Sequence, residues 1–110
     1  MKSSHTYHVF FSNLASPLRV DIISALNEKE GECVSELSER LRVEQSKLSH
    51  ALSALKKCNL VDSKRKGKRK IYFLNKSTMI PILKIIDRHA KYHCKGKCLD
   101  CIFRKKIIKK

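Results

Sequence analysis

The 110-residue chain has no tryptophan, three glycines and two prolines, and it contains no run of about 18 apolar residues. The scarcity of glycine and proline argues against a turn-rich β-sandwich and favours one small, mainly helical domain. The lack of a long apolar run predicts no membrane span, and no apolar stretch of signal-peptide length follows the N-terminus. We therefore expect a cytoplasmic protein whose five cysteines stay reduced.

Acidic residues are also few, because 10 Asp and Glu stand against 25 Lys and Arg, for a formal net charge of +15. This excess is far larger than solubility requires, and it predicts a polyanionic partner, with nucleic acid as the first candidate. The chain has no glycine-rich phosphate loop and no nucleophile and base in a recognisable enzyme motif. We predict a binding protein that is not an enzyme and has no small-molecule substrate.

The N-terminal part of the chain predicts two helices. Ser16 and Pro17 are typical of an N-cap and a first helical residue, and apolar residues at helical spacing continue to Leu26. The short aromatic run at residues 7–11 is compatible with a helix or a strand, and we favour a helix.

The centre of the chain predicts a helix-turn-helix. Apolar residues three and four apart mark one helix at residues 33–41 and another at 45–57, with the short link 42–44 between them. The second of these helices leaves small polar residues on its open face. Two short helices joined by a tight turn are typical of a DNA-binding helix-turn-helix.

Two strand-like runs follow, at residues 60–63 and 71–74, and they flank the basic segment 64–70. In this segment six cations surround Gly67. A β-hairpin with Gly67 near its tip is predicted, because glycine tolerates the positive φ that tight hairpin turns require.

A last helix is predicted to start at Ser77 or Thr78, since Pro81 is tolerated only within the first turn. We expect it to end near residues 94–96. The chain is accordingly divided into a DNA-binding domain at residues 1–93, to which the family resemblance described next assigns dimerisation as well, and a Cys- and Lys-rich tail at 94–110.

The order of these elements is that of a winged helix-turn-helix, which is mainly α with a small β-hairpin. The block Leu14-Ala15-Ser16-Pro17-Leu18-Arg19-Val20-Asp21-Ile22-Ile23 resembles the Leu-Ala-Asp-Pro-Thr-Arg-x-x-Ile-Leu opening of ArsR/SmtB-type repressors, and blocks between Ser35 and Leu74 resemble later parts of that family. The resemblance implies a homodimeric transcriptional repressor with a helical dimer interface. It also implies a helix that enters the major groove of a double-stranded DNA operator, and, as in many members, release of DNA when a metal or metalloid binds.

The helix at 45–57 carries the side chains that we expect to reach DNA bases. Those on its first turns and off the leucine stripe are Gln45, Ser46, Lys47, Ser49 and His50. Glutamine can pair with adenine, lysine with guanine, and serine with phosphates or bases. The alternative is a polar face that is only solvated.

The hairpin cations are predicted to lie along the phosphates or to reach the minor groove. They are Arg65, Lys66, Lys68 and Arg69. Such contacts contribute affinity and little direct sequence information. A solubility role is the alternative, but six cations in seven residues repel one another unless an anion accepts them.

The C-terminal cysteines and histidines predict a metal site. The candidate ligands are His89, His93, Cys94, Cys98 and Cys101. The histidines are four residues apart on one expected helix face, and Cys98-x2-Cys101 has zinc-knuckle spacing. Four of these groups could surround Zn²⁺ or another thiophilic metal or metalloid. A structural zinc, a regulatory metal site, a Cys98–Cys101 disulfide switch and an inert set of thiols all remain open.

The chain departs from the family pattern at two metal motifs. Where thiolate-sensing members have Glu-Leu-Cys-Val-Cys-Asp-Leu, only the first cysteine is matched, by Cys33. Asp87-x-His89 resembles the first half of the terminal-helix zinc site, but the downstream His and Glu are missing. Any sensing is therefore expected to use the tail, and Cys58 is predicted to be a small core residue.

Together these features predict a sequence-specific DNA-binding repressor of the ArsR/SmtB type with a C-terminal Cys/His site. Two alternatives belong to other classes. One is a non-specific nucleic-acid-binding or nucleoid-type protein with a structural zinc or a redox-active tail. The other is a protein-interaction module built on a degenerate winged helix.

Overall fold

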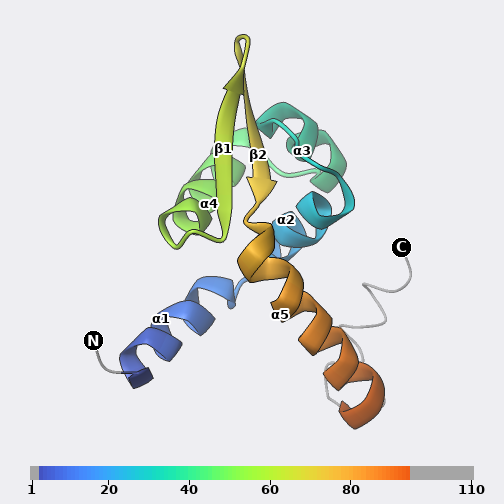
Figure 1. The fold of residues 1–110 in the computed structure, drawn as a ribbon. Coiled ribbons are helices and arrows are strands. Elements are labelled where there is room, and N and C mark those ends of the chain that lie inside the picture. The colour runs from blue at the N-terminus through green and yellow to red at the C-terminus, as the bar shows by residue number, and fades with distance from the viewer. Residues whose placement is uncertain (1–2, 95–110) are drawn as a thin grey trace. The chain divides into compact units, whose positions relative to one another are not determined.

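The computed structural model describes the backbone of residues 3–94 and the side chains of residues 6–92 (Figure 1). The chain divides into two units, residues 1–75 and residues 76–110. The elements of the first unit are α1 (Ser3–Leu14), α2 (Pro17–Glu28), α3 (Val34–Leu41), α4 (Gln45–Lys57), β1 (Val61–Lys66) and β2 (Arg69–Leu74). The second unit contains α5 (Lys76–His89) and the π-helical turn η1 (Ala90–Cys94).

The start of α2 follows from its first residues. Ser16 is an N-cap with extended backbone, its Oγ accepts a hydrogen bond from the Arg19 N–H at 3.4 Å, and Pro17 is the first helical residue, as predicted. Arg19 Nη1 in turn donates to Asn13 Oδ1 at 2.6 Å, which ties α2 to the end of α1. The aromatic run at residues 7–11 lies within α1, so the helix that we favoured there is confirmed.

No single helix among the described residues has the length and apolar character needed to cross a membrane. The segments 6–14 and 17–28, bent by 81° at the break between them, pass that test only as a pair and only by length and composition.

The helix-turn-helix is formed by α3 and α4, with the link 42–44 between them as predicted. Arg42 ends α3 in the left-handed conformation (φ 55°), and the Ser38 hydroxyl donates to the Val43 carbonyl at 2.7 Å. The core that holds these helices against α2 is aliphatic. Its least exposed members on the three helices are Ile22, Ile23, Leu26, Leu37, Leu48, Ala51, Leu52 and Leu55. Burial of these side chains fixes which face of α4 stays open.

The hairpin extends further than the sequence predicted. β1 and β2 pair antiparallel in register from Val61↔Leu74 to Lys66↔Arg69, so most of the basic segment is itself paired strand. Gly67 lies at the tip with φ 67°, which confirms the expected turn. Near the base, Tyr72 and Glu32 exchange two backbone hydrogen bonds of 3.0 and 2.9 Å, which form an isolated β-bridge between β2 and the segment before α3.

The second unit corrects one prediction. α5 begins at Lys76, so Pro81 is its sixth residue and lies inside the helix, not in its first turn. Pro81 has no N–H to donate to the Ser77 carbonyl, but only one bond near the start of the helix is lost, and the remaining turns form. After His89 the backbone continues as the π-helix η1, whose wider repeat alters the spacing on which the shared face of His89 and His93 was predicted.

Candidate DNA-binding surface

The open face of α4 carries the five side chains predicted to reach DNA bases. Gln45, Ser46, Lys47, Ser49 and His50 are all exposed and lie in the first turns of the helix. On the opposite face, Leu48, Ala51, Leu52 and Leu55 are buried. The structure therefore places the five residues on one accessible surface of the second helix of the helix-turn-helix, the element that enters the major groove in this motif.

A hollow of about 430 Å³ adjoins this face. Its lining comes from the start of α2 and from α4, and consists of Ser16, Leu18, Arg19, Ser46, Lys47, His50 and Ala51. The N-terminus of a helix presents backbone N–H groups and a positive dipole end, which favour an anion beside it. The hollow thus extends the candidate surface onto α2. This part of the surface was not predicted from the sequence, although the helix start at Ser16-Pro17 was a signal for it.

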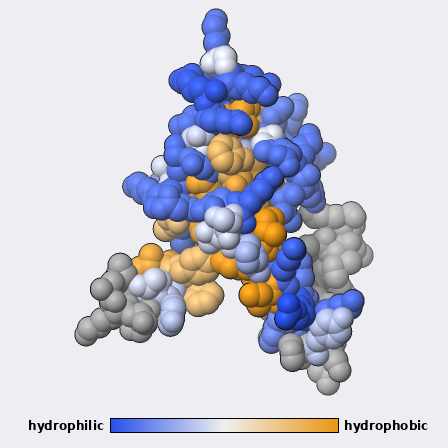
Figure 2. Space-filling view, viewed as in Figure 1, coloured by the Kyte–Doolittle hydropathy of each residue, from blue (hydrophilic) through white to orange (hydrophobic). Residues whose placement is uncertain are grey.

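The cations of the hairpin form the second part of the surface. Arg65, Lys66, Lys68 and Arg69 are exposed, and the outer half of the hairpin is covered by hydrophilic side chains (Figure 2). Two neighbouring lysines lean on aromatic rings of β2: Lys64 Nζ lies 5.7 Å from the centre of the Phe73 ring, and Lys70 Nζ lies 5.5 Å from that of Tyr72. The hairpin is therefore a wing with most of its charge directed to solvent.

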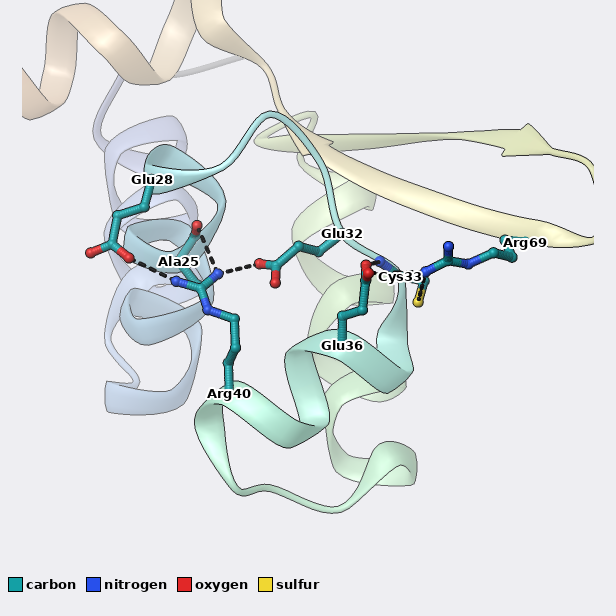
Figure 3. Close-up of polar contacts among 7 residues, drawn as sticks. All are labelled: Ala25, Glu28, Glu32, Cys33, Glu36, Arg40 and Arg69. Atoms are coloured by element: carbon teal, nitrogen blue, oxygen red, sulfur yellow. Dashed lines mark hydrogen bonds and ion pairs between the residues drawn. The ribbon is translucent and has the colours of Figure 1, made fainter.

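Arg69 differs from the other wing cations because its side chain turns back to α3 (Figure 3). Its Nη2 donates to Cys33 Sγ at 3.0 Å and forms an ion pair with Glu36 Oε2 at 3.1 Å. Glu36 also accepts a hydrogen bond from the Cys33 backbone N–H at 3.0 Å through Oε1. The Cys33 N–H and Arg69 together hold the pKa of the Glu36 carboxyl below its usual range.

Cys33 matches the one thiol that the chain shares with the sensing motif. It is the buried N-cap of α3, and its Sγ lies 3.2 Å from Ser35 Oγ. Burial raises the pKa of the Cys33 thiol, but hydrogen bonds with Ser35, Arg69 and the backbone N–H of Glu36 lower it, so the net pKa lies below its usual value. Within the described residues, no three His, Cys, Asp or Glu side chains gather as a metal site.

Cys58 is not the core residue that the sequence predicted. It is the C-cap of α4 and is only partly buried, because the helix ends there and the leucine stripe does not continue. Its thiol borders a hollow of about 330 Å³ lined also by His8, Val9, Ser12, Asn13 and Arg19.

The predicted metal ligands fall at the end of the described chain or beyond it. His89 is the exposed last residue of α5, and His93 and Cys94 belong to the backbone of η1. Cys98 and Cys101 lie outside the described residues. The tail site stays a prediction.

An exposed polar recognition helix next to a basic two-stranded wing defines a winged helix-turn-helix DNA-binding protein. Residues 16–63 match the sequence pattern of the family of bacterial regulatory proteins called the arsR family. The arsenical resistance operon repressor of Bacillus subtilis (strain 168) is 34% identical over 100 residues, which cover 91% of this chain and 84% of that repressor. The chain belongs to the arsR family of bacterial transcriptional regulators.

Solved structures agree with this fold. The crystal structure of NolR from Sinorhizobium fredii matches with a TM-score of 0.70 and 27% identity, over 77% of this chain and 84% of that one. The homodimeric winged helix-turn-helix domain of a possible ArsR-family regulator from Mycobacterium bovis has the same fold, with a TM-score of 0.70 and 22% identity over 79% of this chain and 80% of that one. The predicted fold and family are confirmed.

Proposed function

We propose that this chain is a cytoplasmic, homodimeric repressor that recognises a two-fold-related DNA operator. The observation that carries the proposal is the exposed polar face of α4, which lies in the same unit as the cationic wing. The first turns of α4 would enter the major groove, where Gln45 and Lys47 can reach base edges. The wing cations would neutralise phosphates of the adjoining backbone. The name of the Bacillus subtilis relative supports repression as the outcome.

Dimerisation is proposed from the apolar residues that the two terminal helices expose. On α1, Tyr7 is 62% and Phe11 66% exposed, and on α5 Ile85 and Ile86 are also exposed. Large exposed apolar side chains grouped on helices mark surfaces that another protein covers. A second copy of the chain is the partner we propose, with support from the homodimeric domain of the same fold.

Selection of a binding site from random duplex DNA, followed by competition with bulk DNA, tests the proposal. A repressor should prefer one pseudo-palindrome by a factor of about a thousand or more. If each subunit neutralises about four phosphates, the log–log salt slope should be near −7, from −0.9 per phosphate. Preference near unity would support the non-specific nucleic-acid-binding alternative, and a salt-independent affinity would contradict DNA binding itself.

We further propose that the C-terminal segment makes the repressor responsive to a thiophilic metal or metalloid. The support is the spacing of Cys94, Cys98 and Cys101 behind His89 and His93, together with the arsenical resistance named for the Bacillus subtilis relative. When bound, such an ion would bring the tail thiolates together with the last helix. The described residues before His93 do not supply a competing site.

Metal stoichiometry of chelator-free protein tests this second proposal. Joint replacement Cys98→Ser and Cys101→Ser should abolish uptake of Zn²⁺, whereas Cys58→Ser should bind as the parent does. Equal uptake by all three proteins would place the ligands elsewhere. A DNA-shift assay with and without the ion then shows whether binding weakens or strengthens the operator complex.

A further inference from the structure

The guanidinium of Arg69 closes a ring of contacts between the wing and the start of α3 (Figure 3). From Arg69 Nη2 the ring passes to Glu36 Oε2, through the carboxylate to the Cys33 N–H, and through the Cys33 side chain back to Arg69 Nη2. The two residues in contact with Arg69 lie more than 30 positions earlier in the chain. The ring therefore joins two elements that are remote in sequence.

The contact of Arg69 with α3 matters for the wing because Arg69 lies close to the hairpin tip. Arg69 is the first residue of β2 and pairs with Lys66 next to the turn. Nearer the base, Tyr72 is bonded to Glu32, and Lys56 Nζ donates to Ser63 Oγ at 2.7 Å. Of these tethers, the Arg69 contacts lie nearest the tip. Without them, the outer residue pairs would form a free two-stranded ribbon, which is marginally stable in water.

The charge of Arg69 is already compensated inside the protein. The Arg69 side chain is 56% exposed, yet its guanidinium contacts the Cys33 sulfur and the Glu36 carboxylate, which raise the pKa of Arg69 above its usual value. Arg65, Lys66 and Lys68 form no ion pair within the described residues. For Arg69 to reach a phosphate, two protein contacts would have to break, whereas the other three cations have none to give up.

We propose that Arg69 is a positioning residue of the wing and does not itself neutralise a DNA phosphate. Its contacts with Glu36 and Cys33 set the place at which Arg65, Lys66 and Lys68 meet the DNA backbone. This inference rests on the proposed binding of duplex DNA, and it reassigns one of the four wing cations predicted from the sequence to lie on the phosphates.

The salt dependence of affinity for the selected operator separates a positioning residue from a phosphate contact. Lys68→Ala should reduce the magnitude of the log–log salt slope by about 0.9 per subunit, because one phosphate contact is lost. Arg69→Ala should weaken binding about tenfold, because one or two freed wing residues then have to be ordered when DNA binds. The salt slope of Arg69→Ala should stay at the parent value, because no phosphate contact is lost. A slope reduced as in Lys68→Ala would overturn the proposal.

Two matched substitutions on α3 provide a second test of the positioning role of Arg69. Glu36→Gln and Glu39→Gln each remove one negative charge from the same helix, but only Glu36 pairs with Arg69. Electrostatic repulsion alone predicts that both variants bind DNA as tightly as the parent or slightly more tightly. The positioning role predicts that Glu36→Gln binds several-fold more weakly than Glu39→Gln. Equal affinities for the two variants would overturn it.

Amide hydrogen exchange without DNA measures the stability of the wing directly, so it tests the role of Arg69 independently of DNA binding. The amides that face the partner strand near the tip, those of residues 64, 66, 69 and 71, should be protected in the parent and in Glu39→Gln, and should exchange faster in Arg69→Ala and Arg69→Lys. A lysine keeps the charge, but its ammonium lies one bond closer to the backbone than the Arg69 Nη2 that meets both partners. Unchanged protection in Arg69→Ala would overturn the positioning role. Failure of the parent to bind DNA would instead contradict the proposed function.

Discussion

Arg40 on α3 forms an ion pair with Glu32, whose carboxylate is buried with 1% of its surface exposed. The same guanidinium pairs with Glu28 Oε1 at 2.7 Å and donates to the Ala25 carbonyl at 3.4 Å (Figure 3). Because Glu28 and Ala25 belong to α2, one side chain joins α2, the segment before α3, and α3 itself. This contact fixes how α3 lies against α2.

Arg40→Ala should destabilise the protein by on the order of 3 kcal/mol, because it leaves the buried Glu32 charge without its partner. Glu28→Gln removes the other ion pair of the same arginine, but Glu28 is 63% exposed, and its loss should cost about 1 kcal/mol or less. Denaturant unfolding measures both. Equal free energies of unfolding in the two variants would show that burial of Glu32 does not dominate.

Gly31→Ala should destabilise the base of the wing. A Cβ at this position would lie 2.7 Å from Ile71 Cγ2, and that methyl group is close to the β2 backbone, so either β2 or the loop that carries Gly31 has to shift. We expect a loss of about 1–3 kcal/mol, as for other overpacked sites. In a double-mutant cycle, Ile71→Ala should relieve part of this loss. Strict additivity of the two substitutions would contradict the clash.

The Arg69–Glu36 contact should give the wing a dependence on acidic pH. The folded-state pKa of Glu36 is lowered by the Cys33 N–H and by Arg69, so its contribution to stability is present above the ordinary carboxyl pKa. That contribution disappears as the pH falls through the lowered pKa. An NMR titration of the Glu36 carboxyl carbon should show a higher pKa in Arg69→Ala than in the parent. The same pKa in both proteins would exclude the contact in solution.

Phe11→Glu should convert the proposed dimer to a monomer, because it places a charge on the exposed apolar face of α1. Val20→Glu is the control, because Val20 is also an exposed apolar residue but lies on α2, outside the proposed α1 face. Sedimentation equilibrium measures the mass, and operator affinity should fall together with dimer content because each half-site would then be bound alone. A Phe11→Glu protein that stays dimeric would move the interface away from this face.

Local signals explain what the sequence predicted correctly. Ser16-Pro17 marks a helix start through one side-chain cap and one fixed φ angle, and Gly67 supplies the positive φ of a hairpin turn. Each of these effects acts within a few residues. The leucine spacing of α4 likewise determined which face is buried and therefore where the predicted base-reading residues lie.

Contacts between distant segments explain what the sequence could not predict. Arg69 was counted with the wing cations, because nothing in its neighbourhood along the chain announces a carboxylate and a sulfur 33 and 36 positions earlier. The hollow between α2 and α4 likewise depends on the angle at which two helices meet. Pro81 was misplaced because the helix begins directly after β2 and Asn75, a boundary set by the preceding strand.

Glu32 makes two different contacts that join distant parts of this small fold. Its backbone pairs with Tyr72 of the wing, and its carboxylate holds Arg40 of the helix-turn-helix. A displacement of Glu32 would strain the contact with the wing and the contact with α3 together, because both are made by this one residue. The short loop between α2 and α3 therefore couples the position of the wing base to that of the first helix of the helix-turn-helix.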